Sequence, residues 1–183
     1  RSIRDIVDAY GQPLRRYALE YDRTVSLQAT HLVHYAMREV VREGTGRGVY
    51  RYLKQDFEVA GKTGTTNEGR DSWFAGFSGD LLAVTWIGRD DNGRTGLTGS
   101  SGALKVWADF MAGASERSLS YRMPDNIETQ WIDNRHGMLT GEGCAEARML
   151  PFIAGSEPAK STGCRPRQSS VADWFQSLFG RGY

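Results

Sequence analysis

The sequence predicts an α+β fold in which helices pack an antiparallel sheet, followed by a loop-rich C-terminal extension. The apolar periodicity gives the order hairpin, helix, three strands, helix, which is typical of a sheet covered by helices. The links between the three strands are too short for the crossover that parallel strands need, so we expect an antiparallel meander. After residue 115 polar residues, glycine and proline dominate. The chain therefore divides into a body, residues 1–115, and an extension, residues 116–183.

The first two predicted elements are a β-hairpin within residues 1–17 and a helix over residues 27–43. Short runs of alternating character flank the turn Gly11-Gln12-Pro13, which predicts the hairpin. Ser26 can cap the helix, and Gly44 can end it. Between these ends the apolar residues recur at helical spacing: Ala29, Val33, Ala36, Met37, Val40 and Val41.

After a glycine-rich loop, residues 44–48, we expect three strands and a second helix. The strands are predicted over residues 57–66, 72–77 and 81–88. The helix is predicted over residues 103–111, with an apolar face formed by Leu104, Val106, Trp107 and Phe110. Large aromatic side chains usually lie in cores, so we expect the same of Trp73, Trp86 and Trp107.

The extension holds both cysteines, Cys144 and Cys164. Their spacing does not match the C-x-x-C pairs of zinc sites. Spacing alone leaves two interpretations open, a disulfide in an oxidising compartment and two free thiols in a reducing one. Near the C-terminus, residues 171–179 have the pattern of a short amphipathic helix without a basic face, which favours docking on the body over lying on a membrane.

Composition and charge exclude several function classes. A net charge of +1 over 183 residues argues against general nucleic-acid binding, which needs a basic excess. No apolar run approaches the ~20 residues that cross a bilayer. His31 and His34 lie on one predicted helix without a third ligand nearby, so we expect no metal site. The chain begins at Arg1 without a methionine, and we interpret it as a piece of a longer polypeptide.

The segment with the clearest chemical character is Val59–Thr66, with the sequence VAGKTGTT. A phosphate-binding P-loop would need a glycine where Asp56 stands and a helix afterwards, so we reject a nucleotide site. The other interpretation is the K-T-G strand of serine acyl-transferases that react with penicillins. Lys62 would place a positive charge beside a substrate carboxylate, and Gly64 would let a peptide lie close against the strand. Taken alone, three residues recur by chance, and an ordinary strand lysine is the simpler interpretation.

The flanks of this motif resemble the transpeptidase domains of class A, bifunctional penicillin-binding proteins of Gram-negative bacteria. The resemblance is carried by Met37–Gly46, Ala60–Asn67, Asp71–Phe77, Val84–Asp90 and Gly99–Ala103. It is strong over residues 1–113 and weaker from there through Cys144 and Cys164 to the end. It implies the fold shared by these transpeptidases and β-lactamases, of which residues 1–115 would be the C-terminal part.

The resemblance implies peptidoglycan cross-linking by D-Ala-D-Ala transpeptidation. In this reaction a serine attacks the penultimate D-alanine of a stem peptide, releases the terminal D-alanine, and passes the acyl group to an amine of a neighbouring stem. Lys62 would steady the substrate carboxylate and the proton network, and the backbone N–H of Thr65 would be one oxyanion donor. Contacts with the substrate or a β-lactam would come from Thr63, Gly64, Thr65, Thr66 and Trp73.

The resemblance also implies a Cys144–Cys164 disulfide, a location at the periplasmic face of the inner membrane, and no cofactor. Its implied partners are stem peptides, β-lactams, the upstream part of the same polypeptide, an outer-membrane lipoprotein activator and proteins of division and elongation, with no nucleic acid. The parent would carry a glycosyltransferase and a membrane anchor as well.

Two motifs of the family, S-x-x-K and S-x-N, are missing. No serine of the chain has lysine three positions on or asparagine two positions on. We therefore expect the nucleophile on upstream polypeptide, and this chain alone to be inactive and poorly soluble because of exposed apolar surface. The alternatives are a D-Ala-D-Ala carboxypeptidase or β-lactamase, and a non-catalytic domain that binds peptidoglycan or a partner protein.

Overall fold

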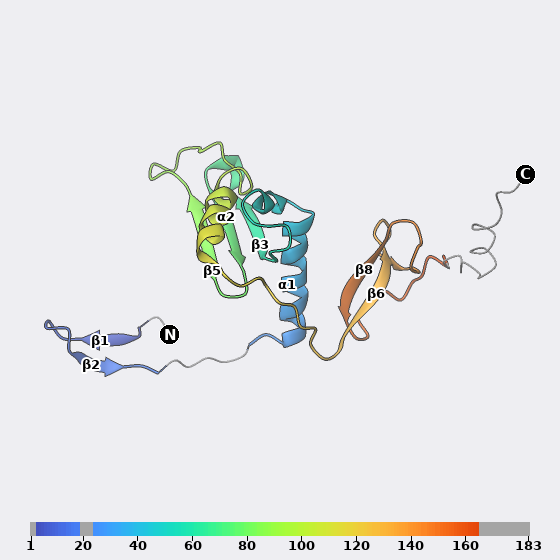
Figure 1. Cartoon of the computed structure of the whole chain (residues 1–183), viewed down its shortest axis with the longest axis horizontal. Helices are drawn as coiled ribbons and strands as arrows, with labels where there is room; N and C mark the ends of the chain where they lie inside the picture. The colour runs from blue at the N-terminus through green and yellow to red at the C-terminus, as the bar shows by residue number, and fades with distance from the viewer. Residues whose placement is uncertain (1–2, 19–23, 165–183) are drawn as a thin grey trace, which may run out of the picture.

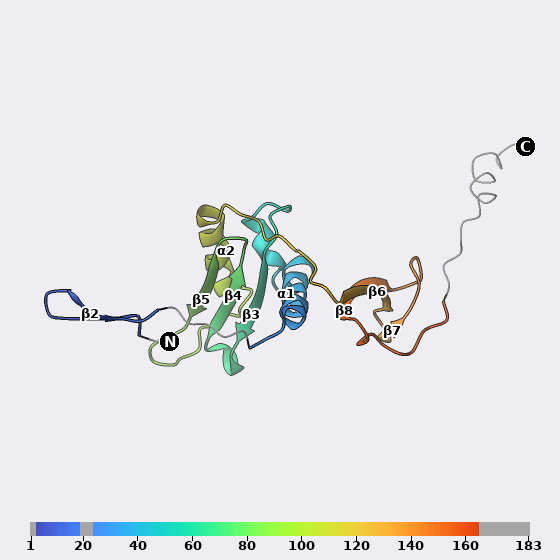
Figure 2. The same cartoon turned by 90° about the horizontal axis from the view of Figure 1, so that it is seen from below.

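The computed structural model describes residues 3–18 and 24–164 of the chain. A small hairpin lies apart from a central sheet with two helices, and a second sheet follows (Figure 1, Figure 2). The helix expected at residues 171–179 lies outside the described residues. The elements, in chain order, are β1 (Asp5–Val7), β2 (Pro13–Arg16), α1 (Leu27–Arg42), the short 3₁₀ helix η1 (Arg47–Arg51), β3 (Ala60–Thr65), the 3₁₀ turn η2 (Asn67–Gly69), β4 (Ser72–Phe77), β5 (Leu82–Ile87), α2 (Ala103–Ala114), β6 (Ile127–Asp133), β7 (Met138–Leu139) and β8 (Ala147–Ile153).

Helix α1 begins at the predicted residue, Leu27, and ends at Arg42, one residue before the predicted end. The side chain of Ser26 accepts a hydrogen bond from Ala29 N–H at 3.1 Å, and Gly44 follows the last capping residue. The chain then turns tightly against the end of the helix, since a Cβ at either Gly44 or Gly46 would come within 3.0 Å of Val40 backbone atoms. This close approach explains the glycine-rich loop and starts η1, a short helix that sequence periodicity did not predict.

The central sheet is the predicted antiparallel meander, in the order β3-β4-β5. Strand β4 has the predicted bounds, whereas β3 begins at Ala60 rather than at residue 57. The difference has a simple cause. Glu58 N–H donates to Ser118 Oγ and Glu58 C=O accepts from Leu119 N–H, so the backbone here pairs with the segment after α2 instead of with β4.

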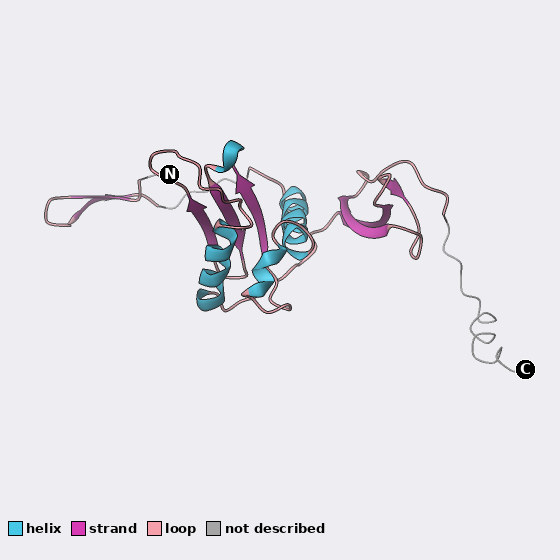
Figure 3. Ribbon diagram, turned by 90° about the horizontal axis from the view of Figure 1, so that it is seen from above, coloured by secondary structure: helices cyan, strands magenta, loops and turns pink. Residues whose placement is uncertain are grey.

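One face of this sheet holds the core. Helix α2 lies across it (Figure 3), and its fully buried Trp107 packs against Phe74 with ring centroids 4.8 Å apart. Trp107 also donates from Nε1 to Ala83 C=O at 3.1 Å. A Cβ at Gly76 would come within 2.8 Å of the Trp107 ring, so the glycine makes room for the indole.

The opposite face of the sheet is open. Trp73 is 42% exposed and Trp86 48% exposed, and Leu82 and Val84 are exposed beside them. The expectation that all three tryptophans lie in the core is therefore right for Trp107 and wrong for Trp73 and Trp86. Side chains alternate between the faces of a strand, so these residues share a face and leave it apolar.

The expected loops after residue 115 are replaced in part by a second antiparallel sheet, in the order β7-β6-β8. Only Ile127 and Ile132 of β6 are buried, so the strand has little of the alternation that would predict it. Strand β8 contains Pro151, which is tolerated because β8 is an edge strand. The Cys144–Cys164 disulfide implied by the resemblance is present and closes the segment that contains β8.

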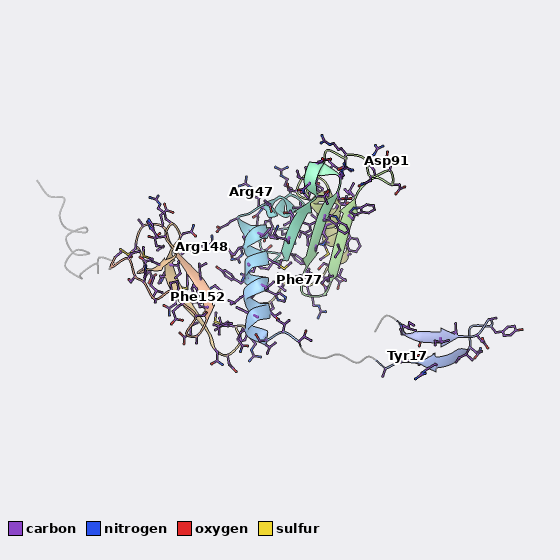
Figure 4. The ribbon with its side chains drawn as sticks, turned by 180° about the vertical axis from the view of Figure 1, so that it is seen from behind. Tyr17, Arg47, Phe77, Asp91, Arg148 and Phe152 are labelled. Atoms are coloured by element: carbon purple, nitrogen blue, oxygen red, sulfur yellow. A yellow bond between two sulfur atoms is a disulfide. The ribbon has the colours of Figure 1, made fainter. Side chains whose placement is uncertain are left out.

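The second sheet contacts α1 through polar groups. Arg148 lies on β8, on the side of the second sheet nearest α1 (Figure 4). It forms ion pairs with Glu39 and, at 2.8 Å, with Glu43. Tyr35 donates from its hydroxyl to Met149 C=O at 3.3 Å. Within the part of the chain that the structure describes, no helix is long and apolar enough to cross a membrane.

Candidate active site

The K-T-G motif lies on β3, at an open edge of the central sheet. No other described strand pairs with β3 on the side away from β4. Thr66 N–H donates to Asp71 C=O, so the even-numbered residues of the strand pair with β4. Bonding groups alternate along an antiparallel strand, and the N–H and C=O groups of Thr63 and Thr65 therefore point to the open edge. Among the described residues, the Thr63 N–H and both backbone groups of Thr65 are open to an extended peptide there, whereas Thr63 C=O accepts from Lys62 Nζ.

Lys62 and Gly64 lie on the open, apolar face of the sheet. Gly64 is opposite Trp73 in the register, and a Cβ at Gly64 would come within 3.1 Å of the Trp73 Cβ. The Lys62 side chain is exposed, and its Nζ donates to Thr63 C=O at 2.9 Å. No carboxylate of the described residues lies within ion-pair distance of it. The structure thus brings an exposed ammonium, without an acidic partner among the described residues, a glycine and an indole together on one face of the sheet.

The threonine side chains project to the other face and are held by two loops. Thr63 Oγ1 lies 2.8 Å from Thr45 Oγ1, which follows α1, and Thr65 Oγ1 accepts from Gly99 N–H at 2.9 Å. Because Thr65 accepts from Gly99, its own hydroxyl proton stays available for a ligand oxygen. Thr45 and Gly99 were not predicted as site residues, although both lie in segments that carry the family resemblance.

Thr66, a predicted substrate contact, uses its hydroxyl inside the protein. Its Oγ1 donates to Asp71 Oδ2 at 3.1 Å and accepts from Asp71 N–H at 2.8 Å, which closes the turn between β3 and β4. The second carboxylate oxygen of Asp71 accepts from Trp86 Nε1 at 2.9 Å. This fixes the Trp86 ring 6.0 Å from that of Trp73 on the open face. Thr66 therefore orders the site rather than offering a free hydroxyl.

Gly99 is seated against the backbone of both site strands. A Cβ there would lie 2.7 Å from Gly64 C=O, 2.7 Å from Trp73 C=O and 2.9 Å from Gly64 N. Backbone atoms of two paired strands cannot yield as a side chain can. The close approach of this loop, and with it the hydrogen bond to Thr65, therefore depends on glycine.

A Gly99→Ala substitution is expected to destabilise the protein by about 1–3 kcal/mol, the range for inserting a methyl group into a packed site. The matched control is Gly113→Ala, in the exposed part of α2, where a Cβ meets nothing within 4 Å. Alanine is favoured over glycine inside helices, so the control is expected to be stabilising by about 0.5–1 kcal/mol. Thermal unfolding of both variants measures this, and equal midpoints would refute the close approach.

The two histidines of α1 pack against aromatic rings. His31 is buried and meets Tyr121 edge-on at 5.2 Å, and His34 lies 4.8 Å from Phe77. Burial, together with the nearby His34 and Arg38 charges, lowers the pKa of His31 below its ordinary value. Over the described ranges, 3–18 and 24–164, no group of three metal-ligating side chains is found.

Comparison with known proteins finds penicillin-binding proteins both among similar sequences and among solved structures. No protein-family model matches the chain. Penicillin-binding protein 1B of Vibrio cholerae is 42% identical over 97% of this chain and 22% of its own length. Penicillin-binding protein 1B of Escherichia coli is 30% identical over 98% of this chain and 24% of its own length. The crystal structure of penicillin-binding protein 1A from Haemophilus influenzae matches 87% of this chain and 29% of that one, with a TM-score of 0.69 and 25% identity. The chain thus spans less than a quarter of these curated relatives.

Proposed function

Because the chain belongs to the class A penicillin-binding proteins, we propose that it forms one wall of a D-Ala-D-Ala transpeptidase site in a longer polypeptide. The observation that carries the proposal is the K-T-G strand at an open sheet edge. There the exposed Lys62 ammonium lies beside Gly64, and two loops hold the hydroxyls of Thr63 and Thr65.

A stem peptide would add to the edge of β3 as a further strand, hydrogen-bonded to Thr63 and Thr65. Lys62 and the Thr65 hydroxyl would hold the terminal carboxylate of the peptide. A serine oxygen would then attack the penultimate carbonyl, and the oxyanion would accept from the Thr65 N–H. Collapse of this tetrahedral intermediate would break the peptide bond and release D-alanine, whose amine takes the proton that the serine lost. The amine of a second stem would later attack the acyl carbonyl and displace the serine oxygen, which takes back the proton that this amine loses.

The serine belongs, in this proposal, to upstream polypeptide that packs on the open face of the sheet. Two observations support this. No serine of the chain is part of an S-x-x-K motif. The open face that carries Lys62 also exposes four large apolar side chains, Trp73, Leu82, Val84 and Trp86. Such an apolar patch is unusual on a surface that faces only solvent.

A periplasmic setting is part of the same proposal. The Cys144–Cys164 disulfide supports it, because such bonds persist in oxidising compartments and are rare in the cytosol. In the same proposal, the longer polypeptide carries an inner-membrane anchor and a glycosyltransferase, and it binds an activator and division proteins.

The test is labelling with a fluorescent penicillin. This chain is mixed with the upstream segment of its own polypeptide, and each is also treated alone. Label is expected on the upstream segment, in the mixture only. A folded complex that stays unlabelled would overturn the acyl-transfer proposal and leave a non-catalytic binding domain as the better account. Rapid release of hydrolysed penicillin from the mixture would instead point to a hydrolase.

A further inference from the structure

The contact between the second sheet and α1 is polar and loosely packed. Arg148, on the strand nearest α1 (Figure 4), forms ion pairs with Glu39 and Glu43 of that helix. Tyr35 adds a hydrogen bond from its hydroxyl to Met149 C=O. Cavities of about 450 and 230 Å³, each lined by residues of α1 and β8, lie along this contact. Because apolar side chains do not fill it, the ion pairs of Arg148 carry much of the attachment.

These ion pairs differ in how far they are shielded from water. The side chain of Arg148 is 32% exposed and that of Glu39 is 19% exposed, whereas that of Glu43 is 65% exposed. Solvent and salt weaken exposed pairs most, so the pair with Glu39 is the stronger of the two. Burial raises the pKa of Tyr35, and the charge of Glu39 raises it further, so the Tyr35 hydroxyl keeps its proton and donates.

The two carboxylates belong to the end of α1 that carries the following turn. Gly44 N–H donates to Glu39 C=O at 3.2 Å, and Gly46 N–H donates to Val40 C=O at 2.9 Å. These hydrogen bonds fix the turn to the last residues of the helix. Thr45, between the two glycines, therefore follows any movement of the helix end.

Thr45 in turn contacts the K-T-G strand, since its Oγ1 lies 2.8 Å from Thr63 Oγ1. Elsewhere on α1, Arg38 and Arg42 pair with Glu58, shortly before β3, at 2.7 and 2.5 Å. Helix α1 is thus held by charged groups both to the K-T-G strand segment and to the second sheet. A continuous series of contacts leads from Arg148 through the end of α1 to the strand.

We propose that Arg148 is a positioning residue for the K-T-G strand. By pairing with Glu39 and Glu43, it holds the end of α1 where Thr45 meets Thr63. The inference rests on the proposed function, to which it adds a role for the second sheet: the docking of this sheet on α1 sets the rate at which the site is acylated. Arg148 does not touch the substrate and acts through the threonine contact.

The first experiment compares the full 183-residue chain with its Arg148→Gln variant by NMR. The methyl signals of Thr45 and Thr63 are expected to shift. Exchange of the Gly46 amide should rise about fivefold, the fold-change that one hydrogen bond is worth in net terms. A folded Arg148→Gln protein with unchanged threonine signals would overturn the proposal.

The control for this experiment is Gln28→Ala, near the other end of α1. It removes the hydrogen bond from Gln28 Nε2 to Asp125 C=O at 3.0 Å, which joins the helix to the segment before β6. The signals of Thr45 and Thr63 should not change in this variant. Equal shifts in Gln28→Ala and Arg148→Gln would mean that any loosening of the second sheet has the same effect, which contradicts a specific role of Arg148.

The second experiment measures the rate of penicillin labelling in the complex with the upstream segment. Arg148→Gln and Glu39→Gln should each slow labelling about fivefold, and the double variant should be no slower than either, because both remove the same ion pair. Arg148→Lys keeps the charge and should restore most of the rate. Additive losses, or no rescue by lysine, would refute the route through Glu39.

The outcomes for the two proposals are distinct. A wild-type complex that stays unlabelled would overturn the proposed function, and with it the effect of Arg148 on acylation. A wild-type complex that is labelled, together with an unchanged rate in Arg148→Gln, would overturn the role of Arg148 alone.

Discussion

A Lys62→Ala substitution is expected to reduce penicillin labelling of the complex between this chain and its upstream segment by ~10²–10³-fold, the typical loss when one preorganised electrostatic contact is removed from an acyl-transfer site. Lys62 has the properties that such a contact needs. Its ammonium is exposed, lacks an acidic partner among the described residues, and is oriented by Thr63 C=O at 2.9 Å. The β-lactam carboxylate would complete its coordination.

The control for this prediction is Lys54→Ala. Lys54 is exposed, precedes β3 and lies outside the motif, so labelling should be unchanged. Thermal unfolding of Lys62→Ala should match the wild type within about 0.5 kcal/mol, because exposed side chains contribute little to stability. A fully stable Lys62→Ala protein that labels at the wild-type rate would remove Lys62 from the site.

The candidate site contains residues that a sequence motif can propose and residues that only the structure brings to it. Lys62, Thr63, Gly64 and Thr65 are contiguous, so a local motif on a strand is enough to propose them as site residues. Thr45 and Gly99 reach Thr63 and Thr65 through tertiary contacts over long sequence separations. The spacing of apolar residues along the chain does not indicate such long-range contacts.

The elements of the fold also differ in how well the sequence predicts them. The helix that starts at Leu27 and the strand Ser72–Phe77 were predictable because caps, short links and a strong apolar pattern agree. Strand β6 was missed because few of its residues are buried, and β8 because it carries Pro151. The two strands are held by pairing with each other and by the disulfide. The pattern of apolar residues within one strand does not indicate either constraint.

The exposed tryptophans were misjudged for a related reason. Trp73 and Trp86 belong to an apolar pattern that predicts burial, yet nothing in the described chain covers them. The sequence pattern indicates that this face of the sheet is apolar, but it does not indicate which polypeptide covers the face. In the proposed function that cover is the upstream segment, so the same residues would be buried in the complete protein.

The largest expected loss of stability comes from Trp107→Ala. Trp107 is fully buried, packs on Phe74 and donates to Ala83 C=O at 3.1 Å. Removing a buried aromatic side chain usually costs about 3–5 kcal/mol, and here the Ala83 carbonyl would also lose its indole partner. Chemical denaturation of the chain measures the change in the free energy of unfolding.

Phe110→Ala provides the comparison, since Phe110 lies on the same helix but is 53% exposed, and its loss should cost at most about 1 kcal/mol. Similar losses for both variants would mean that α2 is held by something other than its buried face. The expected difference also bears on the site. Trp107 fills the space left by Gly76 on β4, the strand that pairs with the K-T-G strand residue for residue. A cavity there should loosen β4, and amide exchange in β3 should rise in Trp107→Ala and not in Phe110→Ala.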